Sequence, residues 1–85
     1  MSELDDLRAQ VSAGDRRIVE LVNERLELVR KIKAHKAEHG IAFVDLERER
    51  AMVDDLLAHS EGALSADGLR RFYAELLALV KRELP

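Results

Sequence analysis

The 85-residue sequence contains no cysteine, one proline, and only two phenylalanines and one tyrosine as aromatic residues. The lack of cysteine excludes disulfides, thiolate metal sites and cysteine nucleophiles. No apolar run approaches the ~20 residues that span a bilayer. The acidic start MSELDD has neither the basic nor the apolar segment of a signal peptide. We therefore expect a cytoplasmic protein that is not bound to a membrane.

Charge is abundant but nearly balanced, since 14 basic and 17 acidic residues give a net charge of −3. Because no overall positive field exists, we expect no nucleic-acid partner, and any anion site must be local. With 47% apolar and 36% charged residues, the composition is typical of a folded helical protein. A monomer of this size buries only about 60% of its unfolded surface, so a partner chain would add stability.

The first part of the sequence predicts one very long helix. Ser2 is a favourable N-cap followed by acidic residues, and no strong stop occurs before Gly40. A helix of about 37 residues is about 55 Å long, too long to be covered by its own chain, which indicates a bundle between chains. Gly14 interrupts the apolar rhythm, either at a close helix crossing or as a tolerated irregularity. The apolar stripe comprises Leu4, Leu7, Val11, Ile18, Leu21, Leu28 and Ile32.

Two shorter helices are predicted after the turn GIAFV. The first is capped by Asp45 and runs to about His59, and the second is capped by Ser65 and runs to the end of the sequence. We find no strand signal, repeat or linker, and so expect a single all-α domain over residues 1–85. The apolar face of the last helix comprises Leu69, Phe72, Tyr73, Leu76, Leu77, Val80 and Leu84.

Three charged residues fall where apolar faces are predicted. Arg25 falls on the apolar stripe of the long helix, Lys36 comes one turn past its last residue, and Glu49 falls on the stripe of the second helix. Charged side chains are rarely buried without a partner, water or a ligand. By composition alone, the favoured interpretation is that Arg25 and Glu49 pair or reach the edge of the stripe. The alternative is that these residues bind a ligand.

Helix geometry limits which cations share a site. Arg25 and Lys36 are eleven residues apart, so they lie on one face and are separated by ~16 Å along the axis, within joint reach of a small dianion. Arg8 precedes Arg25 by seventeen residues, a distance of ~25 Å on the same helix. Arg8 can therefore join this site only from another copy of the chain.

These residues make the sequence resemble the all-helical (AroQ-type) chorismate mutase family. The segment LRAQVSAGDRRIVELVNERLELV is similar to the family's opening helix, with the pairs Leu7–Arg8 and Glu24–Arg25. The similarity continues through Lys36 and through FVDLERER, which resembles the Asp-x-x-Arg-Glu-Arg opening of the family's second helix. It covers essentially the whole chain, and these separations together are fairly specific.

The resemblance implies an intertwined homodimer of three-helix chains of the chorismate mutase II type, with two sites shared between the chains. It also implies an activity, the rearrangement of chorismate to prephenate in the shikimate pathway toward phenylalanine and tyrosine. That reaction is pericyclic and intramolecular, so it needs no nucleophile, general base, metal or cofactor. It needs a substrate held in its reactive conformer and stabilisation of the charge on the breaking ether oxygen.

The resemblance further implies roles for individual residues. Arg8 of one chain and Arg25 of the other would bind the two substrate carboxylates. Lys36 would contact a carboxylate and the ether oxygen, and Arg48 would border the carboxylate end. The ring hydroxyl would be held by two acids of the second helix, Asp45 and Glu49.

The last helix departs from the family's pattern. The family usually places Ser or Thr there, and four residues later Gln or Glu that reaches the ether oxygen, where this sequence has Val80 and Leu84. Glu83 is one residue away, and a slight helix distortion would bring it in, to donate a hydrogen bond when protonated. The departure implies weaker catalysis, a lower pH optimum or a related substrate.

Other functions stay open on the sequence. The same fold would serve a 4-amino-4-deoxychorismate mutase, an isochorismate-pyruvate lyase, or a non-catalytic helical dimerisation or regulatory module. The protein could also dock onto another shikimate-pathway enzyme.

Two further patterns are interpreted as ordinary surface or core. His35 and His39 have metal-ligand spacing, but no third ligand is evident, so we expect a solvated face and no metal. The segment LRRFY would suit a nucleic-acid-binding helix, but net acidity argues against one, and Phe72 and Tyr73 are predicted to be core residues.

Overall fold

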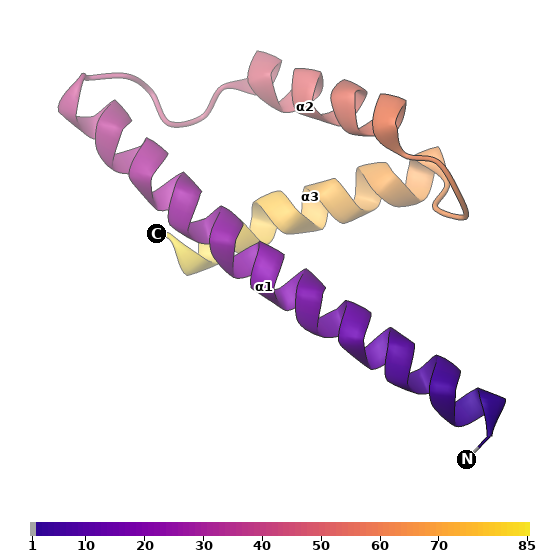
Figure 1. The fold of residues 1–85 in the computed structure, drawn as a ribbon. Coiled ribbons are helices and arrows are strands. Elements are labelled where there is room, and N and C mark those ends of the chain that lie inside the picture. Colours follow the sequence, from indigo (N-terminus) through magenta and orange to yellow (C-terminus); the bar gives the residue numbers. More distant parts are fainter. Residues whose placement is uncertain (1) are drawn as a thin grey trace. The chain divides into compact units, whose positions relative to one another are not determined.

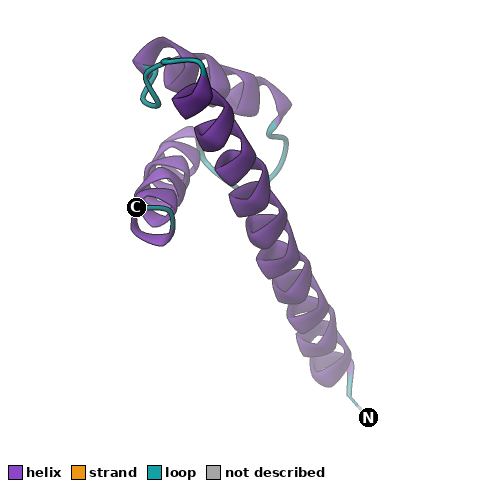
Figure 2. Cartoon of the chain, turned by 90° about the vertical axis from the view of Figure 1, so that its left-hand side faces the viewer, coloured by secondary structure: helices purple, strands orange, loops and turns teal. Residues whose placement is uncertain are grey.

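Three helices make up the protein in the computed structural model, which describes residues 2–85 (Figure 1). They are α1 (Glu3–Glu38), α2 (Leu46–His59) and α3 (Ala66–Glu83). Figure 2 shows only helices and connecting loops, and no strand occurs in these residues. The predicted all-α class and the three predicted helices are confirmed, and α1, with 36 residues, is close to its expected length.

Each helix begins at the predicted cap. In every case the capping side chain accepts a hydrogen bond from a backbone N–H three residues further on, which satisfies a donor that the first turn leaves unpaired. The three bonds are Asp5 N to Ser2 Oγ (3.1 Å), Arg48 N to Asp45 Oδ1 (3.0 Å) and Gly68 N to Ser65 Oγ (3.0 Å).

The end of α1 depends on Gly40, which has a φ of +64°. This left-handed conformation suits glycine, and it lets the chain fold back over the last helical turn. The backbone N–H of Ile41 donates to the carbonyl of Lys36 at 2.8 Å, and that of Gly40 donates to Ala37 at 3.5 Å. This pair of bonds is a Schellman motif, so the predicted stop at Gly40 is confirmed.

The chain divides into two compact units, residues 1–32 and 33–85. The first unit consists of the N-terminal part of α1, which contains no buried residue. A Cβ added at Gly14 would meet no atom within 4 Å. The apolar stripe is more than half exposed at Leu4, Leu7, Val11, Ile18, Leu21 and Leu28.

The second unit holds the last turns of α1 together with α2 and α3, and α2 packs against α3. Its core is small, because the buried apolar residues among those described are Leu69, Tyr73 and Val80, all from α3. Phe72 was predicted to join this core, but its side chain is 53% exposed. That prediction is wrong for the single chain, because Phe72 is rotated by about 100° around the helix from Tyr73.

Candidate active site

Lys36 is positioned by the turn that ends α1. Its carbonyl accepts the bond from Ile41 described above, and its Nζ donates to the carbonyl of Phe43 at 3.0 Å. The same Nζ lies 5.8 Å from the centroid of the Phe43 ring. Both side chains are half-buried. The loop after α1 therefore holds this ammonium group in place through a hydrogen bond and a cation–π contact.

Asp45 and Arg48 lie in the first turn of α2. The Asp45 carboxylate is held at the helix N-terminus by the backbone N–H of Arg48, where the helix dipole favours negative charge. Both residues are exposed. Asp45 is therefore confirmed as a cap, and the implied contacts of both side chains with a substrate stay predictions.

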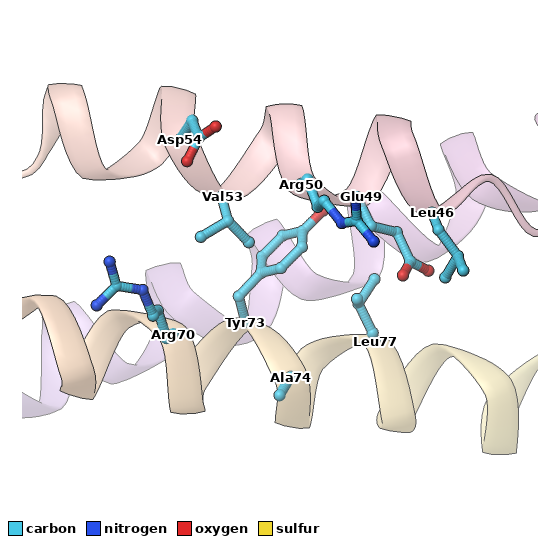
Figure 3. A pocket seen from close by; sticks show the side chains of 9 residues that line it. All are labelled: Leu46, Glu49, Arg50, Val53, Asp54, Arg70, Tyr73, Ala74 and Leu77. Atoms are coloured by element: carbon cyan, nitrogen blue, oxygen red, sulfur yellow. The ribbon is translucent and has the colours of Figure 1, made fainter.

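A groove of about 440 Å³ lies between α2 and α3. Figure 3 shows the ring of Tyr73 extending from α3 toward α2 and Val53 extending from α2 toward α3. Apolar side chains form much of this lining, and charged side chains from both helices flank them. The lining residues are Leu46, Glu49, Arg50, Val53, Asp54, Arg70, Tyr73, Ala74 and Leu77.

Glu49 lies in the wall of this groove and is half-buried. Its position on the apolar face of α2 singled it out in the sequence. In the structure, that position places Glu49 at the groove. Arg50 and Arg70, which also line the groove, were not singled out from the sequence. The sequence signal for both is their position, because each directly follows a residue on the apolar face of its helix.

The end of α3 holds Val80 and Leu84, which depart from the family pattern, and the neighbouring Glu83. Val80 is buried at 5% exposure, and Leu84, the C-cap, is half-buried and donates its backbone N–H to the Val80 carbonyl at 2.8 Å. Glu83 is exposed, and α3 is regular up to this residue. The described chain thus contains no distortion that turns Glu83 onto the face of Val80 and Leu84, and its implied role stays a prediction.

The two arginines of the first unit that were predicted to bind substrate lie on α1. Arg8 is exposed and Arg25 is half-buried. Helix α1 is continuous over both residues, so their ~25 Å separation along the axis holds, and one chain cannot bring both to one small ligand.

Neither a metal centre nor a membrane helix is found among residues 2–85. No group of three or more histidine, cysteine or acidic side chains could hold an ion in this part of the chain. His35 and His39 lie with ring centroids 4.2 Å apart, and both are exposed. None of the described helices is both long and apolar enough to cross a membrane.

The family model of chorismate mutase type II matches residues 7–83. This chain belongs to the chorismate mutase type II family. The family resemblance predicted from the sequence is therefore confirmed, and it extends over nearly the whole chain.

The chain is similar to one solved structure and to one curated protein. The solved chorismate mutase from Thermus thermophilus is similar with a TM-score of 0.89 and 28% identity, covering 93% of this chain and 99% of that one. The T-protein of Haemophilus influenzae is 37% identical over 83 residues, which are 92% of this chain but 22% of the T-protein. This chain therefore spans about a fifth of the length of that curated relative.

Proposed function

We propose that this chorismate mutase domain catalyses the rearrangement of chorismate to prephenate, as an intramolecular isomerase in phenylalanine and tyrosine biosynthesis. The match of residues 7–83 to the family carries the proposal, and the similarity to the Thermus thermophilus enzyme supports it. The reaction breaks an ether C–O bond and forms a C–C bond within one molecule. The enzyme must hold the reactive conformer and stabilise charge on the ether oxygen.

Lys36 is the proposed electrostatic catalyst. An ammonium group has three N–H donors, and the bond to the Phe43 carbonyl uses one of them. The others would bind a substrate carboxylate and the ether oxygen as its negative charge grows. Because the loop after α1 already holds the group, little reorganisation would be needed during the reaction.

The proposed site is shared between two copies of the chain. The long exposed stripe of the first unit needs cover, and the groove between α2 and α3 is open and partly apolar. We propose a homodimer in which the N-terminal part of α1 of one copy covers this groove in the other. Arg8 of one chain and Arg25 of the other would then bind the two carboxylates of one substrate.

The remaining roles belong to α2 and α3. Asp45 and Glu49 would bind the ring hydroxyl, and Arg48 would border the carboxylate end, which the first turn of α2 and the groove wall support. The aliphatic wall would come from Val80 and Leu84. Glu83 is the third proposed contact of the last turn, and it would donate to the ether oxygen in its protonated form after a small shift.

The decisive test offers three substrates separately to the purified protein. We expect loss of chorismate and gain of prephenate faster than the uncatalysed rate. The aliphatic Val80 and Leu84 favour a second candidate, a mutase or lyase for an amino or iso analogue, so 4-amino-4-deoxychorismate and isochorismate form the other arms. No acceleration with any of the three would overturn the enzymatic proposal and favour a non-catalytic dimerisation or regulatory module.

The setting of the domain is also proposed. We expect it to act in the cytoplasm on a small dianion, and to act as a single domain over residues 1–85. Docking onto another shikimate-pathway enzyme is a further proposal, because the domain covers 22% of its T-protein relative. Co-sedimentation of the purified protein with such enzymes would test it.

A further inference from the structure

Two lysines of α1 lie one turn apart and contact the same aromatic ring. Lys33 Nζ is 5.7 Å and Lys36 Nζ is 5.8 Å from the centroid of Phe43. Residues three apart share one face of a helix, and ammonium groups are attracted to the face of an aromatic ring. Phe43 therefore couples the position of Lys33 to that of the proposed catalytic Lys36.

Lys33 also bonds to the far end of the second unit. Its Nζ donates to the carbonyl of Leu84 at 2.9 Å and to that of Pro85 at 2.6 Å. Hydrogen bonds from a charged donor are stronger than neutral ones. The end of α3 is also where the helix dipole favours a cation. This half-buried ammonium group thus ties the end of α3 to the last turns of α1.

The sequence of α3 makes these carbonyls available. A residue before proline is disfavoured in the helical conformation, and Leu84, which precedes Pro85, has φ −124° and ψ 71°. The helix therefore ends at Glu83, and the next two carbonyls leave the helical pattern. Lys33 supplies their hydrogen bonds.

We propose that Lys33 is a positioning residue for the reaction. It fixes the last turn of α3, which carries Val80 and Leu84, against the turn that carries Lys36. Lys33 itself would touch no substrate, because its ammonium group is used by the two carbonyls and the ring. The inference rests on the proposed function, in which Lys36, Val80 and Leu84 line one pocket.

The physical expectation is a loss of rate more than of binding. Without Lys33, the last turn of α3 would fray, because helix ends open with little free energy. A looser wall would still admit the substrate, but it would hold the reactive conformer less often. Small misplacements of that kind lower the rate of the chemical step strongly.

The test compares three variants by chorismate consumption per folded protein. Lys33→Met keeps the apolar stem without the charge, and we expect kcat to fall roughly tenfold with KM changed less than about threefold. Lys33→Arg keeps a cationic donor and should recover most of kcat. Lys31→Met, at an exposed lysine two residues earlier, is the matched control and should behave as wild type.

Hydrogen exchange gives a readout that is independent of activity. The amide of Leu84, bonded to Val80 O, should exchange faster in Lys33→Met and not in Lys31→Met. An inactive wild type with this exchange pattern would overturn the proposed function, but not the stabilisation of the end of α3 by Lys33. An active wild type with unchanged kcat in Lys33→Met would overturn the positioning role, whatever the exchange. If Lys33→Met fails to fold, Lys33→Gln replaces it and is judged by the same outcomes.

Discussion

At the scale of single residues, the proposed site depends on one ammonium group that the surrounding backbone holds in place. Lys36 is bonded through its carbonyl to Ile41 and through its Nζ to Phe43. Both partners lie within seven positions in the sequence, so the local turn alone presents the charge. The substrate would therefore meet a donor whose position is largely set before binding.

Replacing Lys36 with alanine should remove this donor. We expect kcat/KM for chorismate to fall by roughly 100-fold to 1,000-fold, as on removal of one oxyanion donor. Progress curves for chorismate consumption measure it, and circular dichroism checks the fold. Lys31→Ala is the control. A kcat/KM close to wild type in Lys36→Ala would contradict the assigned role and support a non-catalytic module.

Leu84 offers a test in the opposite direction. Leu84→Gln would place a hydrogen-bond donor where the family usually has Gln or Glu, and we expect kcat/KM to rise by about tenfold through one added contact to the ether oxygen. Leu84→Met retains an aliphatic side chain of similar size and should show no gain. A rate for Leu84→Gln at or below that of Leu84→Met would mean that residue 84 does not face the ether oxygen.

At the scale of helices, local chemistry decides where each element begins and ends, and long-range packing decides little of it. In α1, Gly14 is the one residue of the helix without a side chain, and a Cβ added there would meet no atom within 4 Å. Gly14 therefore lowers the stability of the helix, and no nearby atom excludes a side chain at this position.

Replacing Gly14 with alanine should stabilise α1. Alanine favours a helix interior over glycine by about 1 kcal/mol, which would raise the midpoint of thermal unfolding by about 4–8 °C in a domain of this size. Circular dichroism at 222 nm on heating would measure it. A lowered midpoint would instead indicate that a second chain crosses α1 closely at Gly14.

The cap of α2 is proposed to serve both folding and binding. Asp45→Ala should lower the free energy of unfolding by about 1 kcal/mol through loss of the cap, and should also raise KM for chorismate. Ser65→Ala removes the equivalent cap of α3, which has no proposed site role, and should lower stability without raising KM. Urea unfolding and steady-state kinetics separate the two effects. Equal KM values in Asp45→Ala and Ser65→Ala would show that Asp45 does not bind the substrate.

At the scale of the whole molecule, the proposed function requires two chains. The first unit exposes an apolar stripe, and the second unit has an open groove and a core of three buried side chains. A single chain with so little burial has little stability to spare. Association would bury the stripe and would bring together arginines that one α1 keeps ~25 Å apart.

Mixing two inactive variants tests the shared site directly. Arg8→Ala and Arg25→Ala should each lose most activity, but a heterodimer of the two contains one site with both arginines. Random exchange should therefore restore about one quarter of wild-type activity, because half of the dimers have one intact site of two. Sedimentation velocity checks that dimers form. No recovery after verified exchange would show that the two arginines do not serve one site across the dimer.

The helices and their ends were predictable because the interactions that set them are local. Each cap, at Ser2, Asp45 and Ser65, bonds three residues away, and the bond that closes the turn at Gly40 joins Ile41 to Lys36. The family was predicted from a resemblance, which rested on sequence segments such as FVDLERER and the pairs Leu7–Arg8 and Glu24–Arg25. Periodicity also indicated Glu49, since a carboxylate on an apolar face stands out.

Tertiary structure alone decided the rest, because these contacts join residues far apart in the chain. The groove between α2 and α3, the exposed face of Phe72, and the bonds from Lys33 to residues 51 and 52 positions away have no local signal. Periodicity defines which side of one helix is apolar but not which helix will cover it. The sequence therefore determined the elements and the family, and packing decided which side chains line the groove and what holds the last turn of α3.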